Sequence, residues 1–585
     1  MAETVPDWST PLTRVGVRDT HGDRSVAQFL WDETRRKGPL VRRITAPDHP
    51  GSLTRLLCAL LLVVTGGAVA TGTAAAAPDH GTTADAPSDA DAAAARFGTL
   101  VPAPVSVRQG GTAYEIGPDT RIRVPDTDGA RRIGEQLAEV LRPSTGYELP
   151  VTTRQGPGIV LRLGAGDPAL GSEGYRLRSS RDGVTISARE HAGLFRGVQT
   201  LRQLLPAAVE RNERQTASWT VAGGTVTDAP RYAYRSAMLD VSRHFFTVGQ
   251  VKKYIDQMAL YKINKLHLHL SDDQGWRIAI DSWPRLAEYG GSTQVGGGAG
   301  GHYTKREYRE IVRYAADRHL EVVPEIDMPG HTNAALASYA ELNCDGVAPP
   351  LYTGTNVGFS SLCVDKEITY DFIDDVVREI AELTPGRYLH IGGDEAHATS
   401  HEDYVAFMAR AQRTVDAYGK TVVGWHQLTG ADPIDGAVAQ YWGTTGTEQG
   451  VVDAAKAGTK LILSPANRSY LDMKYDKDTP LGLSWAGYVE AKQSYDWDPG
   501  SYIKGAPSSA VLGVEAPLWS ETISTSDHIE FMAFPRLPGI AELGWSPAST
   551  HDWDTYKERL AAHGPRWSAM GIDYYRSPQV PWPGE

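Results

Sequence analysis

From residue 236 to residue 516 the chain alternates short apolar runs with helical stretches, and this repeat restricts the fold more than any other feature. The apolar runs have the composition of buried parallel strands. There are eight of them, at residues 236–241, 265–270, 321–326, 388–391, 421–425, 437–442, 460–464 and 510–516. Such a series predicts an α/β fold with a C-terminal (β/α)8 TIM barrel. An open doubly wound sheet is the alternative, but no GxGxxG motif opens a helix after the first strand.

A smaller region precedes the barrel. Residues 98–228 contain strand-like runs, such as 158–163 and 183–188, and helical stretches at 133–141 and 191–205. This mixture predicts a small α+β domain with a largely antiparallel sheet. Because it contains no catalytic constellation, we expect it to be noncatalytic, with the catalytic barrel occupying residues 229–585.

The N-terminal part of the chain has a different character. Arg55 precedes a short apolar run, and small residues follow as far as Ala77. This is the pattern of a secretory signal peptide, so we interpret residues 1–77 as an N-terminal extension with a signal and predict a secreted protein. The signal begins far from residue 1, which indicates a start assigned too far upstream or an unusual leader. Its apolar run is short for a membrane span, and no stable membrane association is expected.

Residues 78–97 consist mainly of Asp, Ala, Thr and Gly, and we predict that they form a disordered tether. The net charge of the 585-residue chain is −13, which argues against nucleic acid as a partner. Of the three cysteines, Cys58 lies in the signal, which leaves Cys344 and Cys363. Two cysteines in an exported chain predict one disulfide, with two buried thiols as the alternative.

Two adjacent carboxylates, Asp394 and Glu395, follow the strand at 388–391 and two glycines. Active sites of TIM barrels lie at the carboxyl ends of the strands. Neighbouring residues on an extended segment point to opposite sides, so the pair is poorly placed to face each other across a bound sugar. We therefore expect different roles, one as proton donor and one as a holding group. The structural alternative is that Asp394 caps the next helix and Glu395 lies in its first turn.

Polar and aromatic side chains also follow the other strands. Carboxylates and arginine bind hydroxyl groups, and tryptophan stacks on the apolar face of a sugar ring. Each residue alone has a structural explanation, as an ion pair, a turn or a core residue. Together they predict a pocket for a pyranose, formed by Arg243, Asp272, Asp327, His331, Trp425, Trp442, Tyr470, Asp472, Trp519 and Glu521.

A metal site is the competing interpretation of some of these residues. His267 and His269 lie on one face of a strand and could bind zinc together with Glu325 or His331. The chain has no HExxH motif and no tight His/Cys cluster. We therefore expect no metal and no other cofactor.

Five motifs carry a resemblance to a known family. RSAMLDVSRHF, HLHLSDDQGWR, EIDMPGH, HIGGDEAH and WSE occur in this order. From about Leu100 to the C-terminus the chain resembles the family 20 glycoside hydrolases, the β-N-acetylhexosaminidases, especially secreted actinobacterial ones. The region at 98–228 then resembles the noncatalytic domain that precedes the barrel in that family.

The resemblance implies an exo-acting, retaining enzyme that removes terminal β-linked GlcNAc or GalNAc from chitooligosaccharides or glycans. The nucleophile would be the substrate's own 2-acetamido oxygen, giving an oxazolinium ion. Glu395 would be the general acid, Asp394 would orient the acetamido group, and Tyr470 would donate to its oxygen. The resemblance further implies that the sugar and its acetamido group are walled by Trp425, Trp442 and Trp519, and that the sugar hydroxyls are bound by Arg243, Asp272, Asp472 and Glu521. Trp485 would lie at the rim of the pocket, where the next sugar is bound. His331 with Asp327 would support Glu395.

Three alternatives remain. A lacto-N-biosidase would release a disaccharide and need a deeper pocket. A noncatalytic sugar-binding protein could use the same barrel, but it would have no use for a proton donor beside an acetamido clamp. A structural wall protein would not need aromatic residues after the strands. The sequence predicts no oligomeric state.

Overall fold

The computed structural model describes residues 88–165 and 167–584. The predicted signal peptide and the first ten residues of the predicted tether lie outside this range. In the described part of the chain, no helix combines the length and the apolar character needed to cross a membrane.

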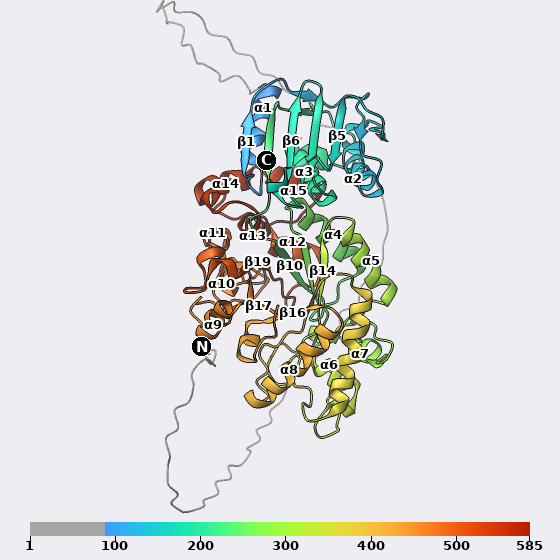
Figure 1. Ribbon diagram of the computed structural model, residues 1–585, viewed down its shortest axis with the longest axis vertical. Helices are drawn as coiled ribbons and strands as arrows, with labels where there is room; N and C mark the ends of the chain where they lie inside the picture. Colours follow the sequence, from blue (N-terminus) through green and yellow to red (C-terminus); the bar gives the residue numbers. More distant parts are fainter. Residues whose placement is uncertain (1–87, 166, 585) are drawn as a thin grey trace, which may run out of the picture. The chain divides into compact units, whose positions relative to one another are not determined.

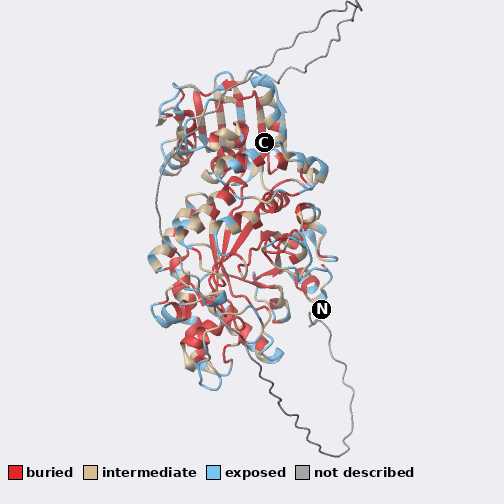
Figure 2. Ribbon diagram, turned by 180° about the vertical axis from the view of Figure 1, so that it is seen from behind, coloured by how far each residue is buried: buried red, intermediate tan, exposed pale blue. Residues whose placement is uncertain are grey.

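The C-terminal region is a closed barrel of eight parallel strands, which confirms the predicted fold (Figure 1). Neighbouring strands pair in chain order, and the last pairs with the first. The strands coincide with the eight apolar runs: β10 (Tyr234–Asp240), β11 (Lys265–His269), β14 (Glu321–Glu325), β15 (Tyr388–His390), β16 (Thr421–Trp425), β17 (Val438–Tyr441), β18 (Lys460–Leu463) and β19 (Val511–Ala516). They are almost wholly buried, as the red strands of Figure 2 show.

Helices follow most of the strands, and their starts have clear local causes. Thr247 and Thr304 each form a capping box with the residue three positions later, and so begin α4 (Val248–Leu260) and α5 (Lys305–Ala316). The other helices of this region are α6 (Asn333–Ser338), α7 (Glu367–Leu383), α8 (His401–Ala417), α9 (Gln449–Ala457), α10 (Ala466–Ser469), α11 (Ala491–Tyr495), α12 (Ser526–Ala533), α13 (Arg536–Trp545), α14 (Trp553–Ala561) and α15 (Gly564–Met570).

The smaller region is an α+β domain, as predicted. Its seven-stranded sheet has the order β1-β9-β6-β7-β5-β3-β4, antiparallel from β1 to β7 and parallel from β7 to β4. The helices α2 (Asp128–Thr145) and α3 (His191–Leu204) pack beside the sheet (Figure 1). The strands are β1 (Ser106–Gln109), β3 (Ile122–Arg123), β4 (Val151–Thr152), β5 (Gly158–Leu163), β6 (Tyr175–Ser180), β7 (Gly183–Ala188) and β9 (Gly224–Asp228).

The end of the predicted tether is ordered, which corrects that prediction for residues 88–97. Helix α1 (Asp89–Ala95) begins at the Ser88 cap, and Phe97 is buried in the core. Arg96 donates hydrogen bonds to the carbonyls of Leu204 and Thr220. Alanine is the best helix former, and a single large aromatic residue is enough to attach the segment to the domain.

A buried polar cluster joins the smaller domain to the barrel. The Lys262 ammonium donates to Asp228 Oδ2 at 2.9 Å and to the Tyr175 hydroxyl at 3.1 Å. Asp228 Oδ1 accepts from the Trp545 indole at 3.0 Å and from the Val105 amide at 3.2 Å. Burial lowers the pKa of Lys262, and Asp228 opposes this effect. Each charge at this joint therefore meets its counter-charge and its hydrogen-bond partners.

Candidate active site

Asp394 and Glu395 lie in a loop after β15. Glycine is required before them, because a Cβ on Gly392 would lie 1.6 Å from Asp327 Oδ1. The helix α8 begins only after Ser400, whose side chain caps it. The alternative that Asp394 caps a helix is therefore wrong. Glu395 has φ 45°, a left-handed conformation that non-glycine residues rarely adopt and that is often found at functional sites.

His331 brings the two carboxylates together. Its Nε2 lies 3.4 Å from Glu395 Oε2 and 3.8 Å from Asp394 Oδ2. The other ring nitrogen, Nδ1, lies 3.2 Å from Asp272 Oδ1, so the Asp272 carboxylate fixes the orientation of the ring. His331 is itself in the left-handed region, with φ 56°. Among the described residues, neither His331 Nε2 nor Asp394 Oδ1 has a hydrogen-bond partner.

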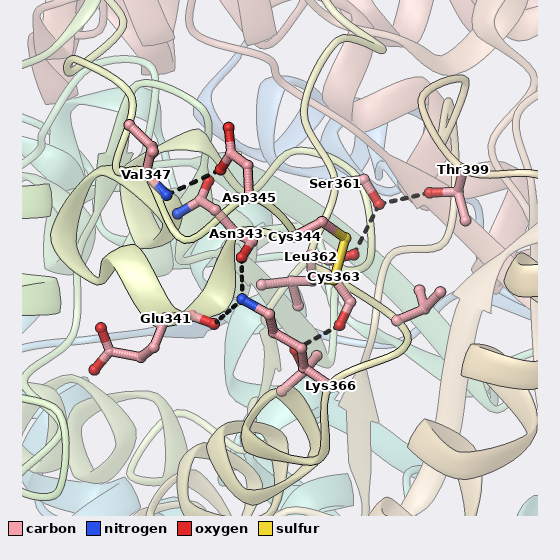
Figure 3. The surroundings of a disulfide bond; sticks show 12 residues. Glu341, Asn343, Cys344, Asp345, Val347, Ser361, Leu362, Cys363, Lys366 and Thr399 are labelled. Atoms are coloured by element: carbon pink, nitrogen blue, oxygen red, sulfur yellow. Dashed lines mark hydrogen bonds between the residues drawn. A yellow bond between two sulfur atoms is a disulfide. The ribbon is translucent and has the colours of Figure 1, made fainter.

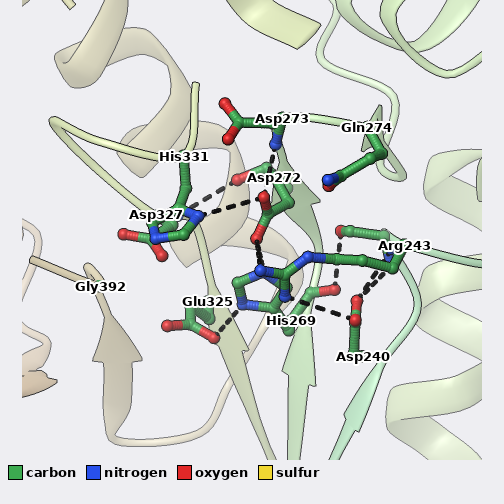
Figure 4. A network of polar contacts seen from close by, with 12 residues as sticks. Asp240, Arg243, His269, Asp272, Asp273, Gln274, Glu325, Asp327, His331 and Gly392 are labelled. Atoms are coloured by element: carbon green, nitrogen blue, oxygen red, sulfur yellow. Dashed lines mark hydrogen bonds and ion pairs between the residues drawn. The ribbon is translucent and has the colours of Figure 1, made fainter. Parts of the chain in front are cut away.

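Asp272 contacts three other residues of the site through its side chain. Its Oδ2 lies 2.7 Å from His269 Nε2 and 2.9 Å from an Arg243 nitrogen (Figure 4). Its Oδ1 accepts from the backbone N–H of Asp273 and faces His331. Both oxygens are thus occupied by protein groups, and the side chain is 1% exposed. Asp272 thus orients Arg243 and His331, and the prediction that it also holds a sugar hydroxyl stays a prediction.

Asp327 makes no ion pair with His331 among the described residues, but its charge acts on that ring. Burial disfavours the His331 imidazolium, whereas Asp272 and Asp327 raise its pKa well above the usual value. The implied support role of Asp327 stays a prediction.

Asp327 Oδ1 accepts from the backbone N–H of Gly393 at 3.1 Å. Burial, with Asp394 adding to it, raises the pKa of Asp327 well above its usual value. Asp327 therefore supports the loop that carries Asp394 and Glu395.

The two loop carboxyl groups differ in their protonation. Burial raises the pKa of Asp394 to about 6, with His331 opposing and the Glu395 charge adding to the rise. Burial also acts on Glu395, but the contact with His331 outweighs it and lowers the pKa of that carboxyl. In the free site, a proton taken up by this pair is therefore held by Asp394.

Aromatic residues form one connected wall. Trp425 and Trp519 have ring centroids 5.7 Å apart, and Tyr470 lies 6.3 Å from Trp519. Trp485 contacts both Trp442 and Tyr470 edge-on, and it is 52% exposed. The predicted wall residues are thus adjacent, with Trp485 at the outer rim. Trp276, which also follows a strand, is instead a core residue whose indole donates to the Ile278 carbonyl.

Arg243, Asp472 and Glu521 supply further polar groups. The Arg243 guanidinium lies 4.7 Å from the centre of the Trp519 ring. Burial raises the pKa of Asp472 well above its usual value, and the Glu521 charge adds to this rise. Burial also raises the pKa of Glu521, although Arg243 opposes it. Neither Asp472 oxygen has a partner among the described residues, so this carboxyl is available to a ligand.

A chain of alternating imidazoles and carboxylates lies inside the barrel. His267 is 2.9 Å from Glu515 and 3.0 Å from Glu325, and His269 lies between Glu325 and Asp272. Burial opposes protonation of both imidazoles, but their carboxylate neighbours raise the pKa to about 10 for His267 and about 9 for His269. Each ring is thus held between two carboxylates.

Four groups of described side chains bring possible metal ligands within 4.8 Å of one another. They are His267/Glu325/His390, His269/Glu325/Asp327, Asp272/Asp327/His331 and His331/Asp394/Glu395. All four share members of the hydrogen-bonded network just described. The sequence alone did not show that Asp240 accepts from the Arg243 backbone, or that His269 lies between Glu325 and Asp272. The alternating HLHL run before Asp272 was the available signal, because it places both histidines inside the barrel.

An eight-stranded barrel with paired carboxylates and an aromatic wall at the carboxyl ends of its strands is the architecture of a glycoside hydrolase. Comparison with known proteins assigns the family. Residues 232–548 match the model of the glycosyl hydrolase family 20 catalytic domain, and residues 98–229 match domain 2 of that family. The chain belongs to glycoside hydrolase family 20 and is a β-N-acetylhexosaminidase-type hydrolase.

Relatives and solved structures agree with this assignment. A beta-N-acetylhexosaminidase of Cellulomonas fimi is 42% identical over 83% of this chain and 97% of its own length. The GH20 beta-N-acetylhexosaminidase structure from Streptomyces coelicolor A3(2) is 71% identical, covers 83% of this chain and 99% of its own, and has a TM-score of 0.82. A mutant Streptomyces plicatus beta-hexosaminidase in complex with product, GlcNAc, is 71% identical with the same TM-score, covering 83% of this chain and 98% of its own.

Proposed function

We propose that this protein removes terminal β-linked GlcNAc or GalNAc from the non-reducing ends of chitooligosaccharides or glycans, with retention and through an oxazolinium intermediate. The observation that carries the proposal is the position of Asp394 and Glu395. Both turn toward the same nitrogen of His331, at 3.8 and 3.4 Å. They therefore meet on one side of the site, whereas the two carboxyl groups of an ordinary retaining glycosidase flank the scissile bond.

The remaining pocket carboxyl groups are poor candidates for an enzyme nucleophile. Burial raises the pKa of Asp472 and Glu521 and so disfavours the ionised form that a carboxylate nucleophile requires. The substrate's acetamido oxygen can supply the missing nucleophile. The Tyr470 hydroxyl is suited to donate to that oxygen, since burial keeps its pKa well above the usual value and the phenol protonated.

The reaction then has two steps. The acetamido oxygen bonds to the anomeric carbon while the glycosidic bond breaks, and the leaving oxygen takes the proton of Glu395. Asp394 accepts a hydrogen bond from the acetamido N–H and stabilises the positive charge that develops there. Glu395 then removes a proton from water, which attacks the anomeric carbon and opens the oxazolinium ring. The product keeps the β configuration.

Substrate binding reverses the protonation of the free site. The acetamido N–H donates to Asp394 and favours its ionised form. The bound sugar also covers Glu395, whose side chain is 28% exposed in the free site, and the loss of water raises its proton affinity. The proton thus moves to the group that must donate it.

Export of the protein is part of the same proposal. The signal-like segment ending at Ala77 supports it, and so does the disulfide between Cys344 and Cys363, since disulfides persist in oxidising compartments. An enzyme outside the cell would meet chitin fragments and glycans directly.

The proposal is tested with the p-nitrophenyl β-glycosides of GlcNAc, GalNAc and glucose, with and without EDTA. We expect rapid, EDTA-insensitive turnover of the two acetamido sugars and none of the glucoside, because only the former carry the nucleophile. Equal turnover of the glucoside would contradict the substrate-assisted mechanism. Loss of activity with EDTA would indicate a metal site.

A further inference from the structure

The segment 344–363 is not part of the barrel, yet it contacts three of the loops that build the site. The Cys344–Cys363 disulfide closes it (Figure 3). Gln274, two residues after Asp272, donates to the Gly354 carbonyl. Ser361 lies 2.6 Å from Thr399, in the loop that carries Glu395 (Figure 3). The third contact, to the His331 loop, is the most specific.

Ser360 and Asp273 hold the backbone next to His331. Ser360 Oγ accepts from the backbone N–H of Thr332 at 2.9 Å and donates to Asp273 Oδ1 at 2.5 Å. The same Asp273 oxygen accepts from the backbone N–H of Asn333 at 2.9 Å. The two residues after His331 are thus fixed by one carboxyl group and one hydroxyl, both in buried side chains.

These contacts complement those of Asp272. Asp272 holds the His331 ring (Figure 4). The next residue, Asp273, holds the backbone that follows His331. A left-handed φ costs free energy for any residue with a Cβ, so His331 keeps its conformation only because its surroundings enforce it. Removing one of these contacts releases the ring that faces Glu395.

Resting on the proposed function, we propose that Ser360 and Asp273 are positioning residues for His331 and, through it, for the proton donor Glu395. Their effect should then be largest on the step in which the leaving oxygen is protonated, because His331 Nε2 lies closer to Glu395, at 3.4 Å, than to Asp394, at 3.8 Å. Attack by the acetamido oxygen depends on Asp394 and Tyr470 and is left largely intact.

Two substrates separate these effects in Ser360→Ala. N,N'-diacetylchitobiose has a sugar leaving group and needs the proton, whereas 2,4-dinitrophenyl β-GlcNAc releases a much more acidic phenol and does not. We expect kcat/KM for the disaccharide to fall about tenfold, a part of the full contribution of general acid catalysis. For the dinitrophenyl glycoside we expect a change of less than about twofold. Equal losses on both substrates would overturn the proposal.

Two further variants separate positioning from general damage. Ser338→Ala removes a buried hydroxyl in the neighbouring α6, where it donates only to the Ala334 carbonyl, and should leave both rates unchanged. Asp273→Asn keeps an acceptor oxygen for Ser360 and Asn333 and should retain most of the disaccharide activity, whereas Asp273→Ala should lose it. Equal loss in both Asp273 variants would contradict the assignment.

A measurement that needs no turnover keeps this proposal separate from the proposed function. In protein labelled with nitrogen-15 histidine, the imidazole signal of His331 is assigned from its loss in His331→Asn. This signal should shift in Ser360→Ala and stay in place in Ser338→Ala. An unchanged signal in Ser360→Ala would overturn the positioning role, even in a protein that fails to cleave either substrate.

Discussion

Two buried charged clusters of this molecule differ in how well their atoms are partnered. At the joint between the domains, Asp228 pairs with Lys262, and its oxygens accept from Tyr175, Trp545 and backbone amides. At the barrel mouth, His331 Nε2 and Asp394 Oδ1 have no hydrogen-bond partner among the described residues, although both residues are buried. A buried polar atom without a partner costs free energy, and at Asp394 it leaves an acceptor oxygen open to the N–H of a ligand. The first cluster therefore serves stability and the second serves chemistry.

The largest expected effect is at the active-site cluster. Asp394→Asn should lower turnover of 2-acetamido substrates by about 10³-fold, because it removes the charge that stabilises the developing oxazolinium ion. The melting temperature at neutral pH should not fall. Burial raises the pKa of Asp394 to about 6, above the value in an unfolded chain, so the ionised group destabilises the fold at higher pH. Steady-state kinetics and thermal melts check both expectations. Near-normal turnover would remove Asp394 from the mechanism.

The opposite outcome is expected at the joint. Asp228→Ala leaves the Lys262 ammonium buried without its counter-charge, and we expect a loss of about 3–5 kcal/mol in the free energy of unfolding. The melting temperature should fall by about 3–5 °C, while kcat of the folded fraction is unchanged. Asp126→Ala is the control, because it breaks an ion pair with Arg131 in which the Asp126 side chain is 83% exposed. Equal melting temperatures in these two variants would mean that the joint does not stabilise the protein.

The sequence predicted the barrel because each strand is a buried run that ends at a polar loop. It did not predict the direction of side chains in those loops. Asp272 and Trp276 both follow β11, yet Asp272 turns toward His331 and Trp276 enters the core. Such directions depend on contacts between residues far apart in the chain. The same holds for Ser360, which reaches Asp273 across 87 positions. No periodic pattern records a contact of this kind.

The helix α1 was missed for a related reason. Its residues looked too polar and too small to fold, and the composition of 78–97 favoured a tether. The observed helix is fixed by Phe97 and by the two hydrogen bonds of Arg96 to distant carbonyls. Composition describes a segment by itself and contains no information about partners elsewhere in the domain.

The smallest expected effect is a shift in the pH dependence of the active-site cluster. The substrate binds with Asp394 ionised, and below a pH of about 6 this requires moving the proton from Asp394 to Glu395. That transfer costs free energy, so kcat/KM should fall as the pH drops through the Asp394 pKa of about 6. Glu395→Gln removes one of the causes that raise this pKa and should move the acid limb to lower pH. Both proteins are measured with 2,4-dinitrophenyl β-GlcNAc, whose cleavage needs no proton donor. The acid limb of the pH profile then gives the pKa of Asp394 in each protein. If the acid limb of the pH profile does not move in Glu395→Gln, the charge of Glu395 does not affect the pKa of Asp394. The two carboxyl groups would then titrate independently.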